Sequence, residues 1–265
     1  MSSIPDAPRA TVGAVSFTVL PLAEAVDAIV SLSTDPGDGA TRGRAVHFAN
    51  AYNVALAHQD PAYARLLNAG DAVFSDGVPI TWVGKRGYPQ LAHDWERVYG
   101  PDVMTAVLSR TGEPAPRQYL LGGSPETLAA LEAAIARDFP RAVIVGAESP
   151  PFAPPTQHDL ETRDQRIRES GATLVWVGLG TPKQDIEVRR LADTLPVVAL
   201  AVGAAFDFLA GTKPQAPVWV QRSGMEWAYR LSSEPKRLGR RYVWGNSVFL
   251  AEAARTLSRT RRQHP

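Results

Sequence analysis

The chain contains no cysteine. This absence excludes disulfide bonds, thiolate zinc sites and a cysteine nucleophile, and it fits a reducing compartment. The five histidines do not form a spaced metal-binding pair such as HExxH. The net charge is only +1, so the chain as a whole has no basic bias toward nucleic acid.

Long apolar runs are missing as well. No run approaches the roughly 18 apolar residues of a membrane-spanning helix. The first residues, MSSIPDAPRATVGAVSF, lack the charged start and apolar core of a signal peptide. We therefore expect a cytoplasmic protein, which can still lie on a membrane surface. The 265 residues, 45% hydrophobic and 21% charged, have an ordinary globular composition and allow one or two domains.

What the sequence does contain is an alternation of short β-rich runs and longer helical patterns. The predicted strands cover residues 14–20, 44–50, 71–77, 117–123 and 172–180. A further strand runs into a Pro-rich loop at 141–152, and a buried strand with a loop lies at 196–211. The predicted helices cover residues 22–33, 53–70 with a break near Pro61, 78–87, 102–112, 124–140, 158–171 and 181–195. This alternation predicts βαβ units and an α/β fold, with a parallel sheet flanked by helices.

Three predicted strands end in glycine before a helix, in LLGGSPE, WVGLGTPKQ and AVGAAFDF. Ligands of open α/β sheets bind beyond the carboxyl ends of the strands, where helix N-termini present free N–H groups to phosphate. A tight turn is the alternative explanation of each glycine, and GGSPE is not the GxGxxG fingerprint. Three such ends together favour a phosphate-bearing ligand. We expect Ser124 to cap the helix that follows the first of them, with Pro125 at its first position.

A single carboxylate, Asp76, lies between apolar runs in VFSDGVPITW and is followed by Gly77. One interpretation is an Asp-Gly turn, in which the glycine adopts a positive φ. The other interpretation is chemical. A carboxylate at a strand end, next to a residue without a side chain, can approach a substrate closely.

The segment from about residue 214 has a different character. Between residues 222 and 262, ten Lys and Arg residues stand against three Glu residues, a local charge of +7 that the whole-chain sum hides. Aromatic residues are interleaved with them, which fits an interfacial helix on an anionic membrane. A basic helical hairpin packed on the main domain and a nucleic-acid site are the alternatives. We predict a core at residues 1–213 and a basic, aromatic-rich helical appendage at 214–265.

Several segments together resemble one family. They are SDGVPITW (75–82), ERVYGPDVM (96–104), YLLGGSPE (119–126), VGLGTPKQD (177–185), VGAAFDFLAG (202–211) and APVWVQRSGMEWAYRLSSEPKRLGRRY (216–242). Residues 14–250 are similar to the bacterial WecG/TagA/CpsF glycosyltransferases, glycosyltransferase family 26. The resemblance implies a Rossmann-like catalytic core that tends to self-associate. It also implies an appendage that docks on the inner face of the cytoplasmic membrane and helps complete the active site.

The resemblance implies a reaction too. Family members transfer N-acetylmannosamine, or another hexose, from a UDP-sugar to an undecaprenyl-diphosphate-linked sugar, with inversion and without a metal or other cofactor. By resemblance, Asp76 is the general base that removes the proton of the acceptor hydroxyl. Two alternatives stay open. One is a glucosyl- or glucuronosyltransferase of exopolysaccharide assembly, and the other is a non-catalytic nucleotide-binding module.

Around the candidate base, the resemblance carries over to three positions. Asn50 corresponds to an Asn that lines the sugar pocket, but Phe48 stands where the family often has Thr. Gly77 follows the base. Arg97 suits a phosphate or sugar contact, and a surface salt bridge with Glu96 or Asp102 is its alternative.

On the nucleotide side, residues 180–185 match the family motif G-[ST]-P-K-Q-E, with Asp185 in place of Glu. Thr181 is expected to cap the next helix with Pro182 at its first position, and Gln184 to read a uracil or ribose edge. Asp207 is a ligand contact or part of a structural turn. Appendage arginines are expected to stabilise the charge on departing UDP. The predicted substrate-binding residues on this side and in the appendage are Gly122, Gly123, Gly180, Thr181, Lys183, Gln184, Asp207, Arg222, Arg230, Arg237 and Arg240.

Overall fold

The structure is a computed structural model that describes residues 4–35, 42–110, 112, 114–233 and 235–263. The chain divides into two compact units. The first unit contains Met1–Glu24, Phe48–Tyr99 and Gln215–Pro265, and the second contains Ala25–His47 and Gly100–Pro214. The predicted division into residues 1–213 and 214–265 stays a prediction, because it is a division by function.

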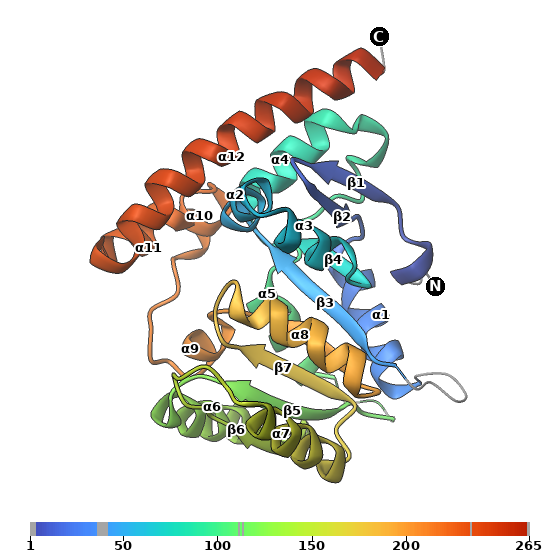
Figure 1. Ribbon diagram of the computed structural model, residues 1–265, viewed down its shortest axis with the longest axis vertical. Helices are drawn as coiled ribbons and strands as arrows, with labels where there is room; N and C mark the ends of the chain where they lie inside the picture. The colour runs from blue at the N-terminus through green and yellow to red at the C-terminus, as the bar shows by residue number, and fades with distance from the viewer. Residues whose placement is uncertain (1–3, 36–41, 111, 113, 234, 264–265) are drawn as a thin grey trace. The chain divides into compact units, whose positions relative to one another are not determined.

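The fold is α/β. A parallel sheet is formed by strands that helices connect along the chain (Figure 1). The strand order is β4-β3-β8-β7-β5-β6. Adjacent strands from β3 to β6 pair in parallel. The predicted Rossmann-like parallel sheet flanked by helices is therefore confirmed. The strands are β3 (Arg44–Ala49), β4 (Ala72–Ser75), β5 (Arg117–Gly122), β6 (Val143–Glu148), β7 (Leu174–Gly178) and β8 (Val198–Ala201).

The second unit is built from βα repeats. Its core is made by the apolar faces of β5, β7 and β8 with helices α7 and α8, and includes Val175, Val177 and Leu191. Ser124 caps α6 by accepting a hydrogen bond from the Thr127 N–H at 3.2 Å, with a proline in the first turn as predicted. The helices are α1 (Leu22–Thr34), α5 (Gly100–Leu108), α6 (Pro125–Asp138), α7 (Gln157–Ser170), α8 (Lys183–Thr194) and α9 (Ala205–Leu209).

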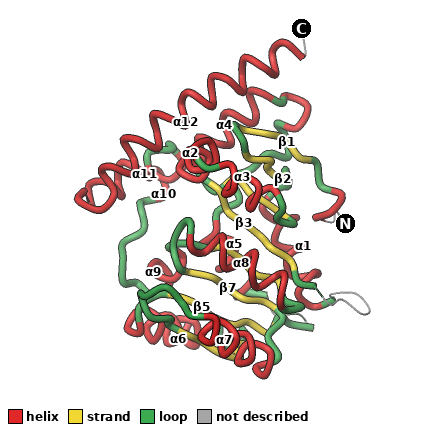
Figure 2. Tube along the Cα trace, in the orientation of Figure 1, coloured by secondary structure: helices red, strands yellow, loops and turns green. Residues whose placement is uncertain are grey.

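The first unit contains an antiparallel hairpin, β1 (Arg9–Val12) and β2 (Val15–Thr18), which turns at Gly13 with φ +62° (Figure 2). The expected single strand at 14–20 is therefore only the second half of a hairpin. The predicted helix break at Pro61 is confirmed, because Asp60 caps the second of two helices and accepts the Ala62 N–H at 2.8 Å. The remaining elements are η1 (Ile4–Asp6), α2 (Ala51–Gln59), α3 (Pro61–Asn68), α4 (Val78–Gly87), η2 (Pro89–Leu91), α10 (Val218–Arg222), α11 (Glu226–Ser233) and α12 (Pro235–Gln263).

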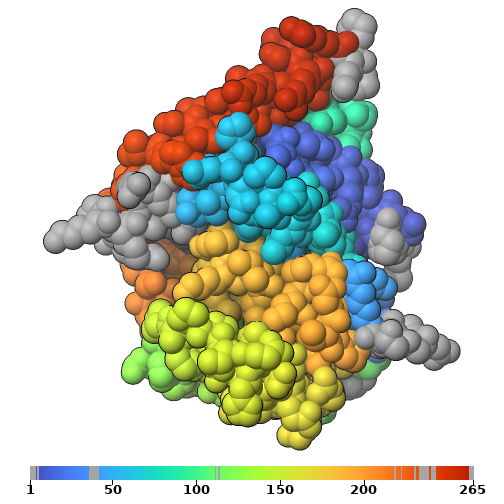
Figure 3. All heavy atoms as spheres, in the orientation of Figure 1, coloured from blue at the N-terminus to red at the C-terminus, as the bar shows by residue number. Residues whose placement is uncertain are grey.

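Helix α12 is packed into the first unit. It lies along the first unit and contacts α2, α4 and β1 (Figures 1 and 3). Phe249 and Ala253 of α12 belong to the unit's hydrophobic core. Thr256 Oγ1 accepts a hydrogen bond from the Gly13 N–H at 3.0 Å, which ties the helix to the hairpin turn. The packed-helix alternative for this segment thus describes what α12 does in the structure. Docking on a membrane stays a prediction.

Candidate active site

Asp76 lies directly after β4 and is half-buried. Its N–H donates a hydrogen bond to the Ala49 carbonyl at 3.0 Å, across from the end of β3. Gly77 is the N-cap of α4 with φ −114°, a conformation that any residue adopts, so the tolerance of glycine for a positive φ is not used at this position. A Cβ at Gly77 would lie 3.5 Å from the Asn50 Cβ. The glycine therefore keeps the surface beside Asn50 and Asp76 uncovered.

Asn50 follows β3 and is oriented by helix α2. Its side-chain oxygen caps α2 by accepting the Tyr52 N–H at 3.0 Å, and Asn53 completes the capping box. Its side-chain nitrogen then points at Asp76 and donates to Oδ2 at 3.4 Å. A donor at this place stabilises the carboxylate in its charged form. The sequence-predicted pair of Asn50 and Asp76 is therefore brought together.

The loop at residues 95–99 supports the end of β4. The Val98 N–H donates to the Ser75 carbonyl at 2.9 Å, and the Ser75 hydroxyl donates to the Glu96 carbonyl at 2.8 Å. Trp95, which is buried, donates its ring N–H to the same hydroxyl at 3.2 Å. Arg97 Nε donates to the carbonyl of Asp76 itself at 2.9 Å. The loop therefore holds the backbone on both sides of the candidate base.

Arg97 is the centre of a polar cluster that reaches into the C-terminal segment. Its Nη2 pairs with Glu226 Oε2 at 2.6 Å, and its Nη1 donates to Gln221 Oε1 at 3.4 Å. The guanidinium carbon lies 3.8 Å from the centre of the Tyr99 ring, and the Tyr99 hydroxyl donates to Glu226 Oε1 at 2.7 Å. Arg97 thus makes one cation–π contact and three hydrogen bonds.

The alternative interpretation of Arg97, a surface salt bridge with Glu96 or Asp102, is replaced by the pair with Glu226. Glu96 instead accepts the Leu22 N–H at 2.9 Å. Sequence reasoning missed the roles of Tyr99 and Glu226. The spacing of Arg97 and Tyr99 was an available signal, because alternate residues of an extended segment lie on one side. Nothing local pointed to Glu226.

In the second unit, two glycines let β5 and β7 end close together. Gly122 has φ +133°, and a Cβ on it would lie 2.5 Å from the Gly178 carbonyl oxygen. This contact alone requires glycine at position 122. Gly123 has φ +73°, and its carbonyl accepts a hydrogen bond from Ser149 Oγ at 2.7 Å. Both residues leave bare backbone at the strand end that precedes α6.

The loop after β7 is organised by Gln184. Its Oε1 accepts the Gly180 N–H at 3.0 Å, and its Nε2 donates to the Ala201 carbonyl at 3.1 Å, which links the ends of β7 and β8. The prediction that Thr181 caps α8 is wrong. The helix begins at Lys183, with Pro182 at the N-cap and not at the first helical position, and no side chain caps it. Lys183 is exposed beside the buried Gln184.

The sequence model of the glycosyltransferase WecG/TagA/CpsF family matches residues 10–263. The chain belongs to this family. Membership makes it a glycosyltransferase of cell-surface polysaccharide synthesis, with a sugar donor and an acceptor. The segments that carried the resemblance are those that build the clusters around Asp76 and Gln184.

Two acidic positions of this glycosyltransferase have structural partners. Asp185 is fully buried and lies 3.0 Å from Nδ1 of the equally buried His47, so it faces the interior of the second unit. Among the described residues, His47 Nε2 is buried without a hydrogen-bond partner. Asp207 binds Lys213 Nζ at 2.9 Å, and its carbonyl accepts the Thr212 N–H at 3.0 Å. These contacts favour the turn interpretation of Asp207.

Phe48 also has a structural role. It is 4% exposed and packs against Phe74, with ring centroids 5.9 Å apart. The place where the family often has a hydroxyl is here part of the apolar core.

The four arginines predicted to contact substrate in the C-terminal segment lie on its helices. Arg222 ends α10, Arg230 lies in α11, and Arg237 and Arg240 lie in the first part of α12. Their side chains fall outside the described part of the structure, so these four assignments stay predictions.

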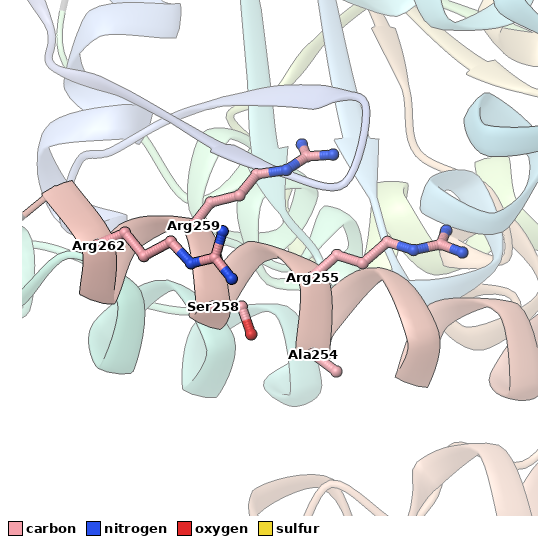
Figure 4. Close-up of a pocket in the computed structure, with 5 residues that line it drawn as sticks. All are labelled: Ala254, Arg255, Ser258, Arg259 and Arg262. Atoms are coloured by element: carbon pink, nitrogen blue, oxygen red, sulfur yellow. The ribbon is translucent and has the colours of Figure 1, made fainter.

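A described basic cluster lies further along α12, where three arginines line a hollow of about 330 Å³ (Figure 4). Arg255 pairs with the buried Glu252, whereas Arg259 and Arg262 have no acidic partner among the described residues. The hollow is lined by Ala254, Arg255, Ser258, Arg259 and Arg262.

The described residues contain no group of three or more His, Asp or Glu side chains arranged to hold a metal ion. In the same part of the chain, every helix is too short or too polar to cross a bilayer.

Proposed function

We propose that the protein is an inverting glycosyltransferase. It moves a hexose, N-acetylmannosamine or a similar sugar, from a UDP-sugar to an undecaprenyl-diphosphate-linked sugar. The observation that carries the proposal is Asp76, a half-buried carboxylate directly after a strand. Its backbone N–H and C=O are both hydrogen-bonded, and a side-chain amide faces its Oδ2.

In the proposed step, Asp76 accepts the proton of the acceptor hydroxyl while that oxygen bonds to the anomeric carbon. The anomeric C–O bond to the diphosphate breaks on the opposite side, and UDP leaves with the bonding electrons. A carboxylate fits this task because it can accept the proton as a general base without forming a covalent bond to the sugar. Nδ2 of Asn50 donates to the carboxylate and orients it before the step.

The second unit supports the nucleotide half of the proposal. Gly122, Gly123 and Gly180 have positive φ values and lie at the ends of β5 and β7, where α/β proteins bind phosphates. Gln184 organises this loop, while Lys183 is exposed at the start of α8 and is available to an anion. Departing UDP carries negative charge, and we propose that Arg222, Arg230, Arg237 or Arg240 stabilises it.

We also propose that the protein works in the cytoplasm, on the inner face of the membrane. Trp82 is 58% exposed and Trp219 is 73% exposed, and the turn between α10 and α11 lies against the Trp82 ring. Exposed tryptophans beside basic helices fit the interface of an anionic membrane. In the arginine hollow on α12, Arg255 is paired with Glu252, and Arg259 and Arg262 add positive charge that no described acidic residue neutralises.

A second candidate function keeps the reaction and changes the sugar. Phe48 is buried against Phe74 where the family often has Thr, which removes one hydroxyl from the sugar side. A glucosyl- or glucuronosyltransferase of exopolysaccharide assembly therefore remains a specific alternative, because those donors present a different hydroxyl pattern.

The test is UDP release from a panel of UDP-sugars, with synthetic polyprenyl-diphosphate GlcNAc or glucose as acceptors. Wild type is compared with Asp76→Asn and with Asp94→Asn, a matched control at a position with no part in the proposed site. We expect acceptor-dependent turnover that survives EDTA, falls by at least about 10²-fold in Asp76→Asn and is kept in Asp94→Asn. Robust turnover by Asp76→Asn would show that Asp76 is not the general base. UDP binding without any turnover would favour a non-catalytic module.

A further inference from the structure

Three side chains of the first unit form a closed ring that the proposed chemistry does not use. Glu226 accepts Arg97 through Oε2 at 2.6 Å and the Tyr99 hydroxyl through Oε1 at 2.7 Å. Arg97 in turn lies over the Tyr99 ring, 3.8 Å from its centre. Each residue therefore contacts the other two.

The ring is shielded from water. The Arg97 and Glu226 side chains are 16% and 17% exposed, and Tyr99 is almost fully buried. A carboxylate that accepts one hydrogen bond on each oxygen in such a place fixes its own rotamer and the rotamers of its donors. The plane of the Arg97 guanidinium is thus defined by contacts on its face and its edge.

The ring acts on the backbone of the candidate base. The third contact of Arg97 is the hydrogen bond from Nε to the Asp76 carbonyl at 2.9 Å. The Asp76 N–H is held by the Ala49 carbonyl at 3.0 Å. Both peptide groups that flank the Asp76 Cα are therefore hydrogen-bonded, one of them through Arg97.

We propose that Glu226 is a positioning residue that acts through Arg97 on Asp76. Glu226 is the first residue of α11, so the C-terminal segment must be in place before the end of β4 is fully ordered. This inference rests on the proposed function in taking Asp76 as the base. A contrary reading makes Glu226 a competitor that occupies Arg97 until a substrate phosphate displaces it. The two predict opposite changes in activity.

The kinetic test uses Glu226→Gln, Glu226→Asp and Tyr99→Phe, with Glu24→Gln as the control, an exposed Glu that also lies in the first turn of a helix. We expect kcat of Glu226→Gln to fall by about 10-fold or more, while KM for the UDP-sugar changes by less than about 2-fold. We expect kcat of Tyr99→Phe to fall less than that of Glu226→Gln, because the ion pair of Arg97 and Glu226 remains. A lower KM or a higher kcat in Glu226→Gln would overturn the proposal in favour of the competitor.

A second readout does not depend on turnover. The Arg97 Nε–Hε signal is assigned by its loss in Arg97→Lys, and it is expected to be sharp and slow to exchange in wild type. In Glu226→Gln it should broaden or shift, and in Glu24→Gln it should stay in place. An unchanged signal in Glu226→Gln would refute the positioning role. If wild type turned over no substrate, the proposed function would fail. The Arg97 Nε–Hε signal would still test whether Glu226 positions Arg97.

Discussion

The side-chain amide of Asn50 joins a helix cap to the candidate base. Its Oδ1 accepts the Tyr52 N–H at 3.0 Å, while its Nδ2 lies 3.4 Å from Asp76 Oδ2. One residue therefore contributes to the stability of α2 and to the orientation of Asp76. The two contributions are separable by mutation, because they use different atoms.

Asn50→Ser keeps a capping oxygen and removes the donor to Asp76, whereas Asn50→Ala removes both. We expect the free energy of unfolding of Asn50→Ser to lie within about 0.5 kcal/mol of wild type, and that of Asn50→Ala to be about 1 kcal/mol lower. Both should lose transferase activity to a similar extent. Urea unfolding and UDP release measure the two effects. Activity that followed stability across the pair would mean that the cap, and not the donor, is what matters.

Gln184 and Lys183 are neighbours with separable roles. Gln184→Leu removes one buried hydrogen bond, to the Ala201 carbonyl, and one partly buried hydrogen bond, from the Gly180 N–H. Because the Ala201 carbonyl loses this buried partner, we expect the second unit to be destabilised by about 1–3 kcal/mol. Lys183→Ala should leave the stability unchanged, because the side chain is exposed.

Calorimetric titration with UDP completes that test. Both variants should bind UDP more weakly, Gln184→Leu because its loop is disordered and Lys183→Ala because a cation is lost. Normal UDP affinity in Lys183→Ala would withdraw that residue from the nucleotide site.

A buried ionic network makes the stability of the second unit depend on pH. Burial pushes the pKa of Glu187 up, but hydrogen bonds and charge from Arg190 and Arg163 outweigh it, so the pKa lies below its ordinary value. Because the pKa is lower in the folded state, the stabilisation is complete above the ordinary Glu pKa of 4.5. It is lost as the pH falls through the lower, folded value.

We therefore expect Glu187→Gln to cost about 3 kcal/mol at pH 7, and the difference from wild type to shrink below about pH 4. Trp176 is the one tryptophan of the second unit and is fully buried, so a fluorotryptophan signal at this position follows the unfolding of that unit. A difference that stayed constant down to pH 3 would contradict the ionic explanation. Asp138→Asn, at an exposed ion pair, is the control.

The sequence predicted the parallel sheet and the strand-end position of Asp76, because buried parallel strands produce apolar runs that local patterns reveal. It did not predict β1, whose four residues start with an exposed arginine and carry little apolar signal. The pairs of Arg97 with Glu226 and of His47 with Asp185 are 129 and 138 residues apart. Periodicity and spacing contain no information on contacts of that range, so the structure alone reveals them.

The arginine hollow on α12 gives the membrane proposal its sharpest test. Arg259→Gln combined with Arg262→Gln removes two charges and leaves the contact of Arg255 with the buried Glu252 intact. Since each basic residue contributes about 1 kcal/mol near an anionic surface, the partition onto phosphatidylglycerol vesicles should fall by about 30-fold. Sedimentation with vesicles measures it, at low and at high salt.

The matched control is Arg137→Gln combined with Arg141→Gln, which removes the same charge from the exposed surface around the end of α6. This variant should sediment like wild type with anionic vesicles, and neither variant should respond to phosphatidylcholine. Equal losses in both double variants would mean that only net charge matters. Binding that persisted in the Arg259 and Arg262 variant at high salt would place the membrane contact on the exposed tryptophans and not on α12.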